Sequence, residues 1–248
     1  MKKALFLFLT LLISCSEESR NLEQYDSASD ITDIMVGGKR LVIPTPIGFK
    51  NASETYLGKN LSRLHKSPMY TNHLFFIRER DFNNLKNENF SENWKKDPFV
   101  LIVRHINEGI EEGYTKEEFL QILEMLRKPD GEVEKLKQEL LELEVASKNE
   151  NYKDFNADKG TDIGSYEIQN LKQFPPYDIK DDSFAVLFIN KSRLGDKVIS
   201  EIILQSYVLT NQKMLILGVL SLDSSKISYM KKIMKDWTKA VKVNQSSN

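Results

Sequence analysis

The sequence has few of the residues that most enzyme sites and structural cross-links need. The 248 residues include one cysteine, Cys15, so the chain cannot form an internal disulfide. Histidine occurs three times, and no two histidines have a short metal-ligand spacing such as HExxH. No GxSxG, GxGxxG or P-loop pattern is present. We therefore expect no catalytic residue, no metal and no cofactor, and predict that the protein is not an enzyme.

The sequence also lacks an excess of charge of one sign and a long apolar run. Lys plus Arg total 35 and Asp plus Glu total 36, a formal net charge of -1, so the composition does not favour nucleic acid as a partner. No apolar run approaches the roughly 20 residues of a membrane-spanning helix. With 40% hydrophobic residues, the chain can build a sizeable core.

The most apolar stretch, residues 4–13, follows two lysines near the N-terminus and is typical of a signal peptide. It ends in Leu12-Ile13-Ser14-Cys15, which resembles the lipobox of bacterial lipoproteins. The resemblance implies that residues 1–14 are a signal peptide, removed after Cys15 receives its diacylglycerol, and that the new amino terminus is then acylated. Two or three acyl chains hold a domain on a membrane far more firmly than one chain does.

These features predict a location in the bacterial cell envelope, anchored to the membrane through the acyl chains on Cys15. Ser16 follows the cysteine where the enteric sorting rule would need aspartate for retention at the inner membrane. We therefore expect the outer membrane, with the protein facing the periplasm. The polar composition of residues 15–38 predicts a flexible tether, and residues 39–243 are expected to form a single α+β globular domain.

Branched and aromatic runs predict a mainly antiparallel sheet. The expected strands are 41–46, 73–79, 99–106, 166–173, 183–190, 198–209 and 213–220. Asn211-Gln212 is a suitable two-residue hairpin turn between the last two. Phe82, Leu85, Phe90 and Trp94 in the polar connection after the second strand are spaced to cover the core.

A helical hairpin is predicted between the two groups of strands. Thr115 and Glu118 form a capping-box pattern, and the helix that they open should end at Pro129. A second helix is expected over 132–147. Its apolar stripe is Val133, Leu136, Leu140 and Leu143. The charged positions favour the solvated side of a packed helix, because two heptads are too short to indicate a coiled coil.

A last amphipathic helix is predicted after Ser224 or Ser225, either of which can cap it. Its apolar stripe comprises Ile227, Met230, Ile233, Met234, Trp237 and Val241. Its other face carries Lys226, Lys231, Lys232, Lys235 and Lys239. This basic face could contact anionic lipid or phosphate groups, but the solvated side of a packed helix is the favoured interpretation.

A few polar residues could contribute to a site. His73 and His105 flank predicted strands and could approach each other, although exposed histidines at strand ends are the favoured interpretation. Asp181-Asp182 and Glu111-Glu112 are adjacent carboxylates, which point in different directions and usually mark turns.

Several features together resemble the PsbP/Mog1-like α/β sandwiches. These are the opening Ile43, Pro44, Pro46, Gly48 and Phe49, the late hairpin YVLTNQKMLILGVLS and a final helix with Trp237. The resemblance implies an antiparallel sheet packed by helices, from which the helical hairpin departs. Members of that group are mostly binding or assembly accessories, so the resemblance supplies no catalytic residue.

The sequence therefore predicts a lipid-anchored envelope protein that acts by protein binding, as an accessory subunit of a larger complex. One alternative is an immunity-type protein that neutralises a periplasmic toxin. Another is an envelope hydrolase whose catalytic groups converge only in the fold, which predicts a cleft lined by His73, His105 or carboxylates with shifted pKa values. Protein binding predicts a shallow apolar, aromatic surface instead.

Overall fold

The computed structural model describes residues 30–85, 98–107, 112–128, 131–159 and 164–246. The chain divides into two units, Met1–Asp30 and Ile31–Asn248. The structure given below is that of the second unit.

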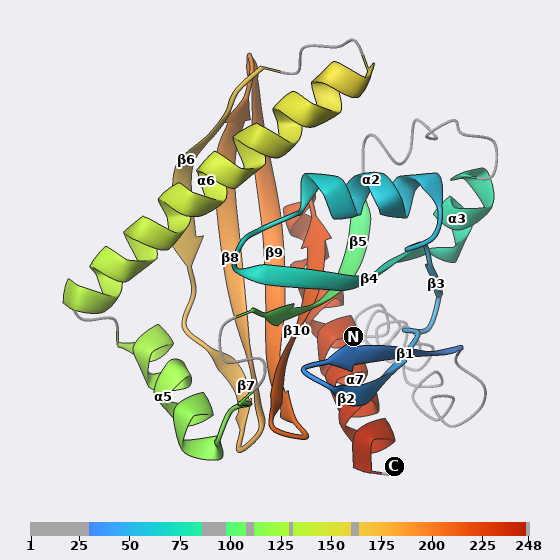
Figure 1. Ribbon diagram of the computed structural model, residues 1–248, viewed down its shortest axis with the longest axis vertical. Helices are drawn as coiled ribbons and strands as arrows, with labels where there is room; N and C mark the ends of the chain where they lie inside the picture. Colours follow the sequence, from blue (N-terminus) through green and yellow to red (C-terminus); the bar gives the residue numbers. More distant parts are fainter. Residues whose placement is uncertain (1–29, 86–97, 108–111, 129–130, 160–163, 247–248) are drawn as a thin grey trace, which may run out of the picture. The chain divides into compact units, whose positions relative to one another are not determined.

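An eight-stranded antiparallel sheet forms the centre of this unit, as the sequence predicts (Figure 1). The main strand order is β3-β4-β5-β10-β9-β8-β6, with β7 paired to β8. The strands are β3 (Phe49–Asn51), β4 (Tyr70–Arg78), β5 (Phe99–Ile106), β6 (Tyr166–Gln173), β7 (Tyr177–Lys180), β8 (Ser183–Leu194), β9 (Lys197–Thr210) and β10 (Lys213–Ser221). The α+β prediction is confirmed, and Asn211 and Gln212 make the β9–β10 turn with φ of 49° and 60°.

One face of the sheet is covered by α7 (Ile227–Ser246) and by a separate two-stranded sheet of β1 (Ile31–Val36) and β2 (Lys39–Pro44). Alternate residues of β4, β5, β9 and β10 form one buried cluster with them. The predicted stripe of α7 is confirmed at Met230, Met234, Trp237 and Val241, each at most 2% exposed. The helix is preceded by a 3-10 turn (Ser224–Lys226) that Asp223 caps, so the predicted serine cap is wrong.

The predicted tether is wrong over residues 31–38. These residues form β1 and the turn to β2, and Ile34 and Val36 are buried in the core cluster. Burial alternates at the end of this strand, with Ile34 and Val36 buried and Met35 exposed, as in a strand with one buried face. The earlier part of the predicted tether lies outside the described residues.

The opposite face carries α2 (Tyr56–Leu64), α3 (Glu79–Leu85), α5 (Lys116–Arg127) and α6 (Gly131–Lys159). Here the buried apolar residues form two clusters, one under α2 and one under α5. Phe82 packs against the α2 cluster, whereas the predicted core contacts of Phe90 and Trp94 lie outside the described residues. The core on this face is therefore divided.

Two helices, α5 and α6, follow one another between β5 and β6, where the sequence predicts a helical hairpin. The Thr115 hydroxyl accepts from the Glu118 amide, and the Glu118 carboxylate accepts from the Thr115 amide, which confirms the capping box. The second helix is longer than predicted and ends at Lys159. Its predicted apolar stripe is not a core stripe, since Leu140 and Leu143 are 37% and 52% exposed. The Val133 and Leu136 side chains lie outside the described residues.

Candidate functional site

A cavity of about 280 Å³ lies between the sheet and α6. Figure 1 shows α6 crossing the sheet on the same side as α2 and α5. The cavity is about twice the size of the ~150 Å³ apolar cavity that holds benzene in another protein. Its lining is mainly apolar and includes Ile102, Leu126, Leu141, Ile168, Phe188 and Ile203. An apolar cavity with a few polar groups is the usual form of a small-molecule site.

Gly218 opens the floor of the cavity. It lies within β10, opposite Ile102 of β5 and Gln205 of β9. A Cβ atom at Gly218 would lie 3.7 Å from Arg104 Nη2 and 3.8 Å from Ile102 Cβ, which are ordinary contacts. Packing therefore does not require glycine here, although glycine weakens a strand interior. A missing side chain at this point leaves space above the sheet.

Arg104 supplies a positive charge to the cavity. It lies on β5 on the same side of the sheet as Ile102, and its guanidinium lies over the Tyr70 ring, with Cζ 5.2 Å from the centroid. Its Nε is buried without an acceptor, and no described carboxylate lies within 4.0 Å of its nitrogens. The positive charge opposes the burial-driven rise of the Tyr70 and Tyr207 pKa values. Arg104 is half-buried, and its guanidinium has the Tyr70 ring but no carboxylate beside it among the described residues.

A second polar group lies around Lys148 of α6. Lys148 Nζ is 3.2 Å from the Tyr166 hydroxyl and 4.5 Å from the centroid of that ring. Asn190 donates to the same hydroxyl at 2.9 Å and to Glu201 at 2.7 Å. Burial alone would lower the pKa of Lys148, but Glu201, Tyr166 and Glu144 outweigh it and raise the pKa. This lysine is charged at neutral pH and already has carboxylates to balance it.

Hydrogen bonds hold α6 over the cavity. Glu144 accepts from the Ser67 hydroxyl at 2.9 Å. Asn149 pairs with the backbone of Tyr166, donating to its carbonyl at 2.9 Å and accepting from its amide at 2.7 Å. These contacts fix the helix to the segment after α2 and to β6. Because polar contacts at its edges hold α6, the space beneath it does not have to be filled.

The cavity continues toward solvent between α5, α6 and β6. A second hollow, of about 520 Å³, shares Leu126, Leu141, Leu171 and Gln173 with the cavity. The Gln173 side-chain amide donates to the Leu126 carbonyl at 3.0 Å across this passage.

No family model matches the chain, and no curated protein matches its sequence. Its structural neighbours have Mog1 and PsbP folds. The Ran-binding protein Mog1p of Saccharomyces cerevisiae is 10% identical with a TM-score of 0.29, over 88% of this chain and 95% of that one. PsbP (CyanoP) of Synechocystis is 11% identical with a TM-score of 0.31, over 87% and 93%. These neighbours match the resemblance noted in the sequence and supply no site residue.

The three histidines occupy two places. His65 lines the cavity, where burial, then the charges of Lys148 and Arg104, lower its pKa to about 3. His73 Nε2 lies 2.6 Å from His105 Nδ1, and His105 is 4% exposed, so the expectation of two exposed histidines is wrong. The pairing of β4 with β5 brings them together, at a bulge next to His73.

The His73–His105 pair lies outside the cavity beneath α6. Neither residue is among those that line the cavity. Burial and then His105 lower the pKa of His73 to about 4, and burial and then Lys213 lower the pKa of His105. Within the described part of the chain, no three or more His, Cys, Asp or Glu residues are placed to hold a metal ion.

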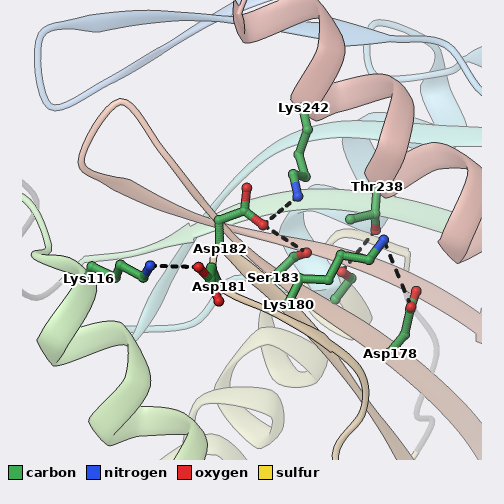
Figure 2. A network of polar contacts seen from close by, with 9 residues as sticks. Lys116, Asp178, Lys180, Asp181, Asp182, Ser183, Thr238 and Lys242 are labelled. Carbon is green, nitrogen blue, oxygen red and sulfur yellow. Dashed lines mark hydrogen bonds and ion pairs between the residues drawn. The ribbon is translucent and has the colours of Figure 1, made fainter.

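The adjacent carboxylates at Asp181 and Asp182 mark a turn, as the sequence predicts. Figure 2 shows them pointing apart, Asp181 toward Lys116 of α5 and Asp182 toward Lys242 of α7. The hydrogen bond from Lys116, 2.8 Å long, lowers the pKa of Asp181. Thr238 of α7 also donates to Ser206 at 2.9 Å. This network joins helices on both faces to the β7–β8 turn.

The basic face of α7 points to solvent. Lys231, Lys232, Lys235 and Lys239 are exposed. Lys231 Nζ lies 4.7 Å from the centroid of the Tyr177 ring. Cys15 and Glu111 lie outside the described residues, and Glu112 is exposed. Of the helices that the structure describes, none has both the length and the apolar character of a membrane span.

The sequence analysis missed the cavity residues, although it contained signals for them. Arg104 is a charged residue inside the apolar run FVLIVRHI, and Gly218 interrupts the strand run MLILGVLS. Glu144 and Lys148 lie four residues apart, which places both on one side of α6. An unexplained charge or glycine in a central strand is the available signal for such a site.

Proposed function

We propose that this chain is a non-catalytic binding protein that holds a small amphipathic molecule in the cavity between the sheet and α6. The observation that carries the proposal is the cavity itself, apolar over most of its lining and continuous with an outer hollow at Leu126, Leu141, Leu171 and Gln173. The described residues around it include no nucleophile paired with a base. The proposed setting is the bacterial envelope, with the domain anchored at Cys15 and facing the periplasm from the outer membrane.

The proposal is tested by placing a larger side chain at Gly218, where the sheet lines the cavity. In the Gly218→Leu variant the new side chain extends into the cavity, whereas the Cβ of Gly218→Ala fits in ordinary contact. We expect octanol, as an uncharged probe, to raise the melting temperature of the wild type and of Gly218→Ala by a few degrees. The rise should be absent in Gly218→Leu.

Thermal unfolding followed by circular dichroism, with and without octanol, makes the comparison. A folded Gly218→Leu variant that still responds to octanol like the wild type would contradict binding in this cavity. Saturation-transfer NMR on octanol provides a second readout that does not depend on stability.

Protein binding is a second candidate, and β1 favours it. Ile31 and Met35 of β1 are 57% and 60% exposed, and among the described residues β1 pairs only with β2. An extended segment of a partner protein could add a strand at the outer edge of β1. This surface suits an accessory subunit of an envelope complex or an immunity-type protein.

Affinity purification from detergent-solubilised envelopes of the host tests this second candidate. We expect a stoichiometric partner with the wild type and at least about tenfold less of it with Met35→Glu, because a charge would be buried at the contact. Leu143→Glu is the matched control, since Leu143 is also exposed, at 52%, but lies on α6. Cys15→Ser tests whether the anchor is required. Equal recovery with Met35→Glu and Leu143→Glu would exclude β1 as the contact.

A further inference from the structure

The two cations that line the cavity, Lys148 and Arg104, differ in whether carboxylates lie near them. Lys148 has Glu201, Glu144 and the Tyr166 hydroxyl near it, and they raise its pKa. Arg104 has only the face of the Tyr70 ring, 5.2 Å from Cζ, and no described carboxylate within 4.0 Å. Both carboxylates of the cavity lining, Glu144 and Glu201, therefore lie near Lys148, and Arg104 has no ion pair among the described residues.

Two carboxylates, Glu144 and Glu201, line the same cavity, but neither lies within 4.0 Å of the Arg104 nitrogens, and both act on Lys148. The other polar neighbours of Arg104 are uncharged. Tyr70 and Tyr207 are phenols whose pKa values are raised by burial, so both are neutral at physiological pH. His65 has a pKa lowered to about 3 by burial, Lys148 and Arg104, so it is also neutral. The remaining polar neighbour on the sheet, Gln205, is an uncharged amide whose oxygen accepts from the Tyr207 hydroxyl at 3.0 Å.

The shape of the free space fits an apolar body attached to one anionic group. Arg104 lies beside the gap above Gly218, where a Cβ atom would be 3.7 Å from Nη2. The same cavity is lined by Phe188 and Leu141, and Leu141 and Gln173 also line the outer hollow. A guanidinium presents a planar set of N–H donors that matches a carboxylate with two parallel hydrogen bonds.

We propose that the ligand of this cavity is an organic carboxylate with a short aliphatic or aromatic body, and that its carboxylate binds the guanidinium of Arg104. This inference rests on the proposed function and specifies its ligand class. The ring of Tyr70 holds the guanidinium from one side, and Nη2, which lies beside the space above Gly218, is the donor nearest to the ligand. The apolar body lies under α6.

The test uses three molecules with the same chain and different head groups: octanoate, octanol and octylamine. We expect octanoate to bind the wild type at least about tenfold more tightly than octanol, because a charge-assisted hydrogen bond is added in a desolvated site. Octylamine should bind most weakly. Isothermal titration calorimetry at pH 7 measures all three.

Two arginine variants assign the effect to a residue. In Arg104→Met, octanoate should lose at least about tenfold in affinity, while octanol should bind as before. Arg40→Gln is the matched control, since Arg40 lies on β2, which covers the other face of the sheet, and pairs with Asp33 at 2.5 Å, and it should leave both affinities unchanged. The Nε–H resonance of Arg104 in the wild type should shift with octanoate and not with octanol, a readout that does not require the variant to fold.

The outcomes separate the two proposals. Equal affinities for octanol and octanoate, tighter binding of octylamine, or an Arg104 resonance unmoved by octanoate would overturn the carboxylate inference while the cavity remains a binding site. If none of the three molecules binds the wild type, the proposed function fails and the inference fails with it. Octanoate binding that is abolished in Gly218→Leu supports both.

Discussion

Replacing Trp237 with alanine will lower the free energy of unfolding by about 3 to 5 kcal/mol, the range for a large buried aromatic side chain. Trp237 is 0% exposed and packs edge-on against Phe76, with ring centroids 5.7 Å apart. Its Nε1 donates to the Pro44 carbonyl at 2.9 Å. The substitution therefore leaves a cavity beneath α7 and removes the donor of a carbonyl at the end of β2.

Two control variants separate the parts of this effect. Trp237→Phe keeps most of the ring and loses the N–H donor, so we expect a loss of about 1 to 2 kcal/mol. Val243→Ala, on the same helix at a position 56% exposed, should change stability by less than about 0.5 kcal/mol. Urea unfolding with a shared m value measures all three. A Trp237→Ala loss no larger than that of Trp237→Phe would show that packing of the ring contributes little.

The sequence was most informative where one face of an element is buried and its ends are marked by turn or cap residues. The predicted bounds of β5 and β6 coincide with the observed Phe99–Ile106 and Tyr166–Gln173. The turn at Asn211-Gln212 and the Thr115 cap depend on neighbours within a few residues, so the sequence contains everything needed to predict them.

The short helix α2 was missed for the opposite reason. Its nine residues include only Leu57, Leu61 and Leu64 as aliphatic positions, too few for a convincing periodic pattern. The Thr55 cap, which accepts from the Gly58 amide at 3.1 Å, was the available signal. Tertiary packing of Leu57 under the helix decides the outcome here.

The cavity could not be predicted, because a hydrophobic pattern indicates which side chains turn inward and not how closely the opposing element approaches. Leu140 lies at a position that the periodicity assigned to the core, yet it is 37% exposed because α6 is held at its edges. The sequence analysis allowed for the approach of His73 and His105 but favoured two exposed histidines, because it could not predict the bulge at His73, which shifts the alternation of the strand.

Lowering the pH from 7 to 5 will destabilise the fold through its histidines. Burial is the largest cause of the lowered pKa of all three histidines. The pKa falls to about 3 for His65 and to about 4 for His73, and the pKa of His105 is lowered as well. In the unfolded chain each imidazole titrates near its ordinary value of about 6.5. Below that pH the unfolded state binds protons that the native state does not.

The sign of the effect follows from this difference in proton uptake. The histidines contribute their full stability above about pH 7, and that stability is lost as the pH falls below 6.5. The slope should be on the order of 1 kcal/mol per pH unit for each histidine that stays neutral in the native state. Urea unfolding at half-unit steps from pH 7 to 5 measures the slope, in a window where most unfolded carboxylates remain ionised.

The variant His65→Gln should reduce this slope by the contribution of one histidine, on the order of 1 kcal/mol per pH unit. Glutamine does not titrate in the native or the unfolded state. With only three histidines in the sequence, proton NMR can follow each imidazole of the native protein through the same range. Native pKa values of about 3 for His65 and about 4 for His73 are expected, with the pKa of His105 also lowered. An unfolding free energy that stays constant from pH 7 to 5 would show that acid does not act on the fold through these histidines. A His73 imidazole that titrates at 6.5 or above would show that the His73–His105 pair binds a proton while it is buried.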